Sequence, residues 1–151
     1  MAVLTTRAVV DRVQARLATA LAAGWTVARG HPATLGTGDS RQLAHHAYSA
    51  WSPSADAVDL SRWQGRQRLS EGTVHRSRVE VRFLARLRAD STSGDVDAAY
   101  DDEDTVRLAV LSTAATDLQL SYIGARRSVL GEGTYQLHEL SFDADHRVSL
   151  Q

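Results

Sequence analysis

The residues whose types and spacing most clearly suggest a chemical role are the arginines of residues 75–88, HRSRVEVRFLARLR. From Val79 onward, apolar side chains occupy the odd positions of this stretch: Val79, Val81, Phe83, Ala85 and Leu87. Apart from Leu84, charged side chains occupy the even positions: Arg76, Arg78, Glu80, Arg82, Arg86 and Arg88. Because side chains on a strand alternate between faces, this pattern predicts a strand with one apolar face and one row of guanidinium groups. Guanidinium groups bind carboxylates and phosphates through paired hydrogen bonds.

The arginine row has three interpretations. It is a solvated sheet face if the arginines lie opposite acids such as Glu139 or Asp143. It is a subunit interface or docking surface if they meet carboxylates of another chain. It is a nucleic-acid contact if they meet phosphates, but such domains usually add stacking aromatics or a basic reading helix, and neither is evident.

Histidines offer a second possible chemistry. His45 and His46 are adjacent, so a strand would direct them to opposite faces and prevent them from forming one site. We expect His75, His138 and His146 to be surface or half-buried strand residues, since their spacing is not typical of metal ligands. An alternative is a small hydrolase or isomerase using His45 or His46 with an acid, which predicts a deep pocket containing a perturbed histidine.

Other motifs fail on inspection. The Gly36-Thr37-Gly38 segment lacks the third glycine of a dinucleotide loop, and Asp95-Val96-Asp97 has Tyr100 where a calcium loop needs glycine. The chain has no cysteine and no G-x-S-x-G sequence. We therefore predict no catalytic, cofactor-binding or metal-ligating residue, and a protein that is not an enzyme.

Length and charge limit the possible domain organisation and binding partners of the protein. A chain of 151 residues predicts a single domain that spans residues 1–151. The net charge of −1 gives no overall attraction to nucleic acid or membrane, and all 17 basic residues are arginine. No signal peptide or membrane-spanning run is visible, so we expect a soluble protein made in the cytoplasm.

The first half of the chain predicts one helix and two strands. Thr5 or Thr6 can cap a helix that runs to about Ala23, with an apolar stripe. The residues of this stripe are Val10, Val13, Leu17, Ala20 and Leu21. Residues 25–29 are a possible short strand and residues 42–51 a longer one. A long polar excursion follows at about residues 52–74, and its Trp63 either folds back on the core or anchors a partner.

The second half adds a helix and two more strands after the arginine-rich one. We predict a helix over residues 95–113 with an acidic first half, and strands over 118–123 and 135–142, the last entered through a turn at Gly131-Glu132-Gly133. The predicted fold is α+β. It has a mixed or antiparallel sheet of about four strands, two main helices on one face, and the order α-β-β-α-β-β.

The layout resembles the tail terminator or tail-completion proteins of long-tailed phages and phage-like gene transfer particles. The resemblance rests on the N-terminal helix, the strand ending AHHAYSAW at Trp51, the alternating strand of residues 78–88 that leads into the helix at Asp97-Ala98-Ala99-Tyr100, and the terminal strand pair. It spans most of the chain. The excursion at residues 52–73 is longer than is usual in that family.

The resemblance implies a virion structural protein, made in the host cytoplasm, that caps the head-proximal end of the tail tube. Such proteins form a homo-oligomeric ring, typically a hexamer, that contacts the tube protein and the head-completion protein while double-stranded DNA passes through its lumen. No membrane is involved. The alternatives are a head–tail connector of the same particle, or a small nucleic-acid-binding module using the arginine strand. The candidate interface residues are Arg76, Arg78, Arg82, Arg86, Arg88, Asp101, Asp102, Asp104 and Trp63.

Overall fold

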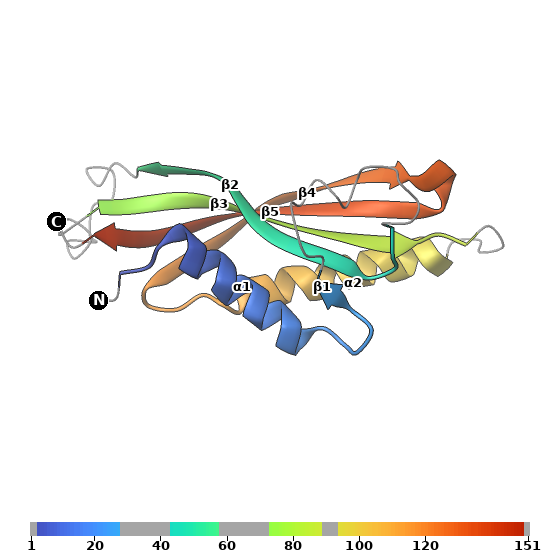
Figure 1. The fold of residues 1–151 in the computed structure, drawn as a ribbon, viewed down its shortest axis with the longest axis horizontal. Coiled ribbons are helices and arrows are strands. Elements are labelled where there is room, and N and C mark those ends of the chain that lie inside the picture. Colours follow the sequence, from blue (N-terminus) through green and yellow to red (C-terminus); the bar gives the residue numbers. More distant parts are fainter. Residues whose placement is uncertain (1–2, 28–42, 58–72, 89–93, 150–151) are drawn as a thin grey trace.

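A computed structural model describes residues 3–27, 43–57, 73–88 and 94–149. It has an α+β fold of one mixed sheet and two helices, which confirms the predicted class (Figure 1). The elements, in chain order, are α1 (Thr6–Ala20), β1 (Thr26–Val27), β2 (Ala47–Ala57), β3 (Thr73–Arg86), α2 (Gly94–Leu111), β4 (Leu118–Leu130), the short η4 turn (Gly131–Gly133) and β5 (Tyr135–Ser149).

The sheet has five strands in the order β1-β2-β3-β5-β4, so the prediction of about four strands was one too few. The chain order is accordingly α-β-β-β-α-β-β around the η4 turn. The additional strand is β1, a two-residue strand within the possible short strand expected at residues 25–29. It pairs parallel to the start of β2, whereas the other neighbours pair antiparallel. The η4 turn joins β4 to β5, as predicted for Gly131–Gly133.

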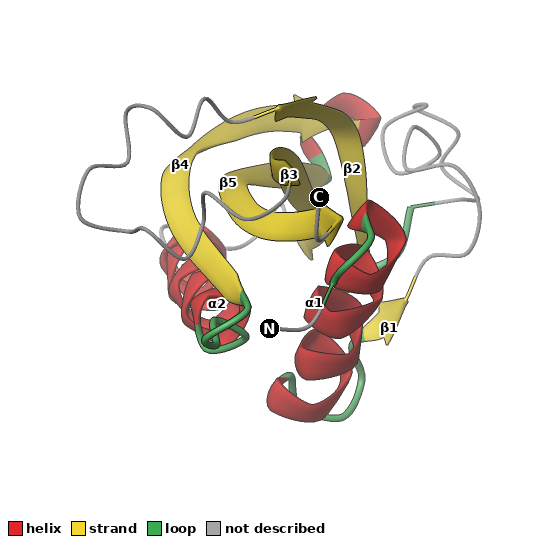
Figure 2. Cartoon of the chain, turned by 90° about the vertical axis from the view of Figure 1, so that its left-hand side faces the viewer, coloured by secondary structure: helices red, strands yellow, loops and turns green. Residues whose placement is uncertain are grey.

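Both helices cover the same face of the curved sheet (Figure 2). The core between them joins Val9, Val13 and Leu17 of α1 to residues of α2 and of the long strands. The α1 stripe therefore repeats every four residues from Val9, and the prediction that Val10 and Ala20 belong to it was wrong, because Val10 is only half-buried and Ala20 is exposed. None of the described helices combines the length and apolar character needed to cross a bilayer.

Helix α1 begins as predicted but ends early. The Thr5 hydroxyl accepts a hydrogen bond from the Ala8 N–H at 3.1 Å, the contact expected of an N-cap residue. The helix ends at Ala20 rather than Ala23, because the extended Leu21 follows it and packs into the core. The left-handed Gly24, with φ of 103°, then turns the chain towards β1.

Strand β2 lies five residues later than predicted and includes the beginning of the predicted polar excursion. Residues 52–57, which include Pro53, belong to the strand, and the rest of the excursion lies outside the described residues. Proline has no N–H to donate to a neighbouring strand. On one side of β2, β1 pairs only with Ala47 and Tyr48, and on the other side the register with β3 shifts between Trp51 and Ser54, so Pro53 is tolerated. At the excursion's other end, Thr73 and Val74 belong to β3.

Strand β3 confirms the alternating pattern. Val79, Val81 and Phe83 are fully buried on the helix-covered face, and the intervening charged residues lie on the opposite face, here called the outer face. Leu84 breaks the charged row because it packs in a second small apolar cluster with Leu43, Ala47 and Leu137.

Candidate interaction surfaces

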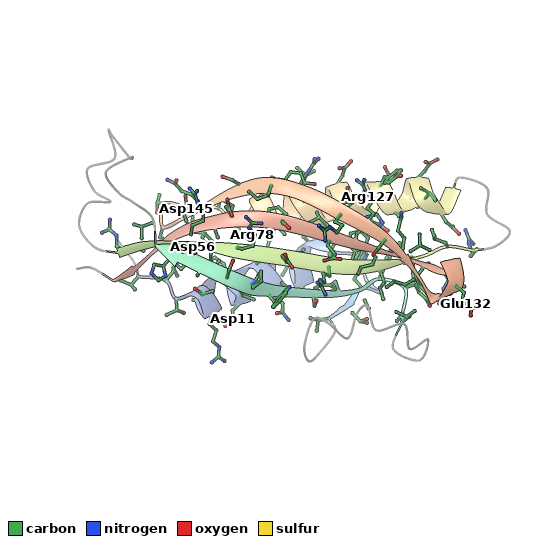
Figure 3. The ribbon with its side chains drawn as sticks, turned by 90° about the horizontal axis from the view of Figure 1, so that it is seen from above. Asp11, Asp56, Arg78, Arg127, Glu132 and Asp145 are labelled. Atoms are coloured by element: carbon green, nitrogen blue, oxygen red, sulfur yellow. The ribbon has the colours of Figure 1, made fainter. Side chains whose placement is uncertain are left out.

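The arginines of β3 lie directly opposite carboxylates of β5 on the outer face (Figure 3). Arg76 contacts Asp145 at 2.8 Å, Arg78 contacts Asp143 at 3.1 Å, and Arg82 contacts Glu139 at 3.1 Å. Each of these pairs matches the register of the two strands. The pairing is the one expected of a solvated sheet face, including its partners Glu139 and Asp143.

The last two arginines of the row are also engaged within the chain. The Arg86 guanidinium lies 5.9 Å from the Tyr135 ring centre, and Arg88 contacts Asp95 of α2 at 2.7 Å. The outer face therefore alternates in charge across the sheet instead of presenting an uncompensated cationic strip. This arrangement weakens the nucleic-acid interpretation, which needs arginines available to phosphates.

The acidic residues of α2 do not act as one cluster. Asp102 accepts a hydrogen bond from the His46 Nε2–H at 2.9 Å, and Asp104 pairs with Arg107 at 3.1 Å. Asp101 is exposed. Asp102 lines one cavity together with Arg86 and Arg88 of the arginine row, whereas no described contact joins Asp101 or Asp104 to that row. Trp63, the remaining predicted contact residue, lies outside the described residues.

His45 and His46 lie together, contrary to the prediction that they face opposite sides. Both precede β2, and His46 has a left-handed φ of 61°, so strand alternation does not apply. Their rings stack with centroids 3.7 Å apart, and Trp25 stacks on the other side of His46 at 3.8 Å. Left-handed backbone is uncommon for histidine, and the sequence carries no signal that predicts it here.

These rings line a cavity of about 380 Å³ between β3 and the first turns of α2. The small side chains of Ala85 and Ala98 leave the space, and Asp102 lies on its wall. Burial and the neighbouring His46 and Arg86 lower the pKa of His45, whose Nδ1 accepts the Arg86 backbone N–H at 3.0 Å. The described lining residues include two histidines and the carboxylates of Asp95 and Asp102, but no hydroxyl or thiol.

A buried ion-pair cluster joins α2 to the sheet. Glu103 of α2 accepts hydrogen bonds from Arg127 of β4 at 2.6 and 2.9 Å and from His138 Nδ1–H of β5 at 2.8 Å. Burial alone would raise the pKa of Glu103, but the bonds from Arg127 and His138 hold it below its usual value. His138 is fully buried, so the prediction of a surface or half-buried residue was wrong. Sequence alone could not have identified this cluster, because Glu103 lies in a run of acidic residues, and such a run predicts a solvent-exposed helix surface.

His146 is also buried and contradicts its prediction. Its Nδ1–H donates to the Leu4 carbonyl at 2.8 Å, and its Nε2 accepts the Ser77 hydroxyl at 2.7 Å. The Ser77 hydroxyl also lies 3.1 Å from that of Thr6. These contacts hold the start of α1 against the sheet. Because Ser77 is fully buried, a substrate cannot reach the serine–histidine pair.

Most of the exposed large apolar residues lie on two elements, α2 and β4. Among the described residues, seven large apolar side chains are exposed, and five of them lie on α2 or β4. These five, here called the α2–β4 patch, are Tyr100, Leu108, Tyr122, Ile123 and Val129. Single exposed apolar residues are ordinary, but three of these five, Tyr122, Ile123 and Val129, lie along the single strand β4.

Strand β4 is also an open edge. It runs for 13 residues and, within the described chain, pairs as a strand only with β5. Such an edge leaves backbone N–H and C=O groups available to another chain.

Among the described residues no group of three or more metal-ligating side chains occurs. A scan of the sequence against protein-family models gives no match, and a search of the curated proteins gives none either.

Proposed function

We propose that this chain is a structural protein of a phage or phage-like tail, which forms a ring on the head-proximal end of the tail tube and joins it to the head-completion protein. The observation that carries the proposal is the open β4 edge with exposed apolar side chains along it. An edge of this length that no other described strand pairs with favours assembly with other chains.

Two further features support an assembly role. The domain is a single sheet with helices on one face, which agrees with the layout on which the resemblance to tail terminators rests. The outer-face arginines are neutralised within the chain, which disfavours a nucleic-acid module. A ring is the closed form of a head-to-tail contact between identical subunits. In that role we expect a ring of six subunits, and double-stranded DNA contacts only the lumen of the ring.

The experiment is to mix the purified chain with bare tail tubes from the same particle and to image the tubes by electron microscopy. Rings at one end of each tube, together with arrested tube growth, are the expected result. Tubes that already carry their native head-proximal cap serve as the control and should gain nothing. A chain that leaves the tubes uncapped but binds tailless heads would instead support the head–tail connector alternative.

A further inference from the structure

The cavity between β3 and α2 is lined by a histidine whose ring is fixed. The Nδ1 of His45 accepts the Arg86 backbone N–H at 3.0 Å, so the neutral ring carries its proton on Nε2. The stack of Trp25, His46 and His45 holds the plane of the ring. Within the described residues no acceptor takes a hydrogen bond from the His45 Nε2–H. The wall of the cavity therefore includes an oriented donor that can serve a bound molecule.

The backbone of His46 is strained in a way that brings both rings to this wall. Its left-handed φ of 61° costs about 1 kcal/mol or more for a residue with a Cβ. The conformation is held by two backbone bonds, because the His46 carbonyl accepts the Thr26 N–H at 3.1 Å and the His46 N–H donates to the Leu84 carbonyl at 2.8 Å. Strained residues that the surrounding structure holds in place cluster at ligand-binding sites.

The charges around His45 favour a bound anion. Burial, His46 and Arg86 lower the pKa of His45, in that order, and the opposing effects of Asp102 and Asp95 are smaller. Both carboxylates are already engaged, since Asp95 contacts Arg88 at 2.7 Å and Asp102 contacts His46 at 2.9 Å. The electrostatic potential at the His45 ring is therefore positive, and an anion beside the ring would be stabilised.

The size of the cavity limits what it can hold. Its volume of about 380 Å³ lies near the lower end of the range of about 300–1,000 Å³ that is usual for small-molecule pockets. Ala85, Ala98 and Ala99 contribute only methyl groups to the wall. The space therefore suits a small molecule with an apolar part against the alanines and a charged group at His45.

We propose that this cavity binds a small molecule through an anionic oxygen group, a carboxylate or a phosphate-like oxyanion, that accepts a hydrogen bond from the His45 Nε2–H. The inference goes beyond the proposed tail function and does not depend on it.

Titration with sodium acetate and with sodium sulfate tests the site, one probe for each class of anion. The chain is labelled with ¹³C-histidine, and the ring signals of its six histidines are followed by NMR at constant ionic strength, with chloride as the replaced ion. The His45 signal should shift and saturate with a Kd of about 10 mM or tighter for at least one probe. The absence of a saturable shift with either probe would overturn the inference.

Two variants with matched controls locate the binding. His45→Asn keeps an acceptor for the Arg86 N–H but removes the Nε2–H, and it should weaken binding about tenfold, read from the His46 signal. Ala98→Leu, at an exposed position of α2, fills the cavity and should abolish saturation without unfolding the helix. His75→Asn on β3 and Ala15→Leu on α1 make the same changes outside the described cavity wall and should bind normally. Normal binding by both cavity variants would overturn the assignment.

The pH dependence gives an independent check. A bound anion favours the protonated form of His45, so acetate or sulfate should bind roughly threefold or more tightly at about pH 6 than at about pH 8, where neither probe changes its own charge. His45→Asn should remove this dependence while His46, Arg86, Asp95 and Asp102 remain. Affinity that is constant or rises with pH would contradict the inference. A chain that binds these anions but caps no tail tubes would leave the inference standing and remove only the tail function.

Discussion

Glu103 shows how one carboxylate can connect three elements of the fold. It is 7 % exposed, and it receives hydrogen bonds from β4 and β5 while its own backbone belongs to α2. A buried charge of this kind is tolerated only when its partners are in place. Removing the charge leaves Arg127 and His138 without their anionic acceptor.

Glu103→Gln is therefore expected to destabilise the domain by about 2 kcal/mol or more, because the single oxygen of a neutral amide cannot replace a carboxylate that accepts three hydrogen bonds. The free energy of unfolding in urea measures this loss. Asp104→Asn, one residue away in an exposed pair with Arg107, should cost less than about 1 kcal/mol. Equal effects of the two substitutions would show that the buried cluster has no special role.

Three histidines with lowered pKa values also predict a pH dependence. Burial lowers the pKa of His45, His138 and His146 from the ordinary value of 6.5. A group whose pKa is lower in the folded state takes up its proton more readily in the unfolded chain, so acid favours unfolding. Stability should be complete above pH 6.5 and should fall as the pH falls below it.

Urea unfolding at a series of pH values between about 8 and 5 checks this expectation. His146→Asn should flatten the dependence, because it removes one of the titrating groups, whatever it does to stability at neutral pH. A free energy of unfolding that stays constant or rises towards pH 5 would contradict the proposed sign.

At the scale of elements, strand β3 was predictable because its pattern is local. Its alternating residues specify which face is buried, and the acids opposite its arginines follow from antiparallel pairing with β5. By contrast, the proximity of His45 and His46 depends on one left-handed residue, and the role of Glu103 depends on contacts 24 and 35 residues away. Such features arise from tertiary structure and leave no local pattern.

The register of β3 and β5 predicts a charge-swap result. Arg82→Glu places two carboxylates opposite each other and should cost about 1 kcal/mol, and adding Glu139→Arg should restore most of it. Urea unfolding of the two single variants and the double variant measures the coupling.

If the outer face lies outside the subunit contact, the swapped double variant should also form rings normally. Loss of rings in a stable double variant would place this pair at the interface.

At the scale of the whole molecule, charge balance separates the candidate functions. The net charge is −1, and the β3 arginines of the outer face are matched by β5 carboxylates. Non-specific DNA binding depends on phosphate neutralisation by uncompensated arginines and lysines.

We therefore expect no measurable binding of duplex DNA at about 150 mM salt and protein concentrations up to about 100 µM. Fluorescence anisotropy of a labelled duplex provides the measurement, and a strongly basic DNA-binding protein provides the positive control. Tight binding that weakens steeply with added salt would return the nucleic-acid module to first place.

The bond between the Leu4 N–H and the Arg147 carbonyl, 2.8 Å long, has a consequence for how the polypeptide can be rewired. Both termini lie at the same end of the molecule in Figure 1. A short glycine-rich linker should therefore be able to join them, with new termini opened at the η4 turn. The resulting circular permutant keeps every strand neighbour, but β5 is synthesised first, before its partners β3 and β4.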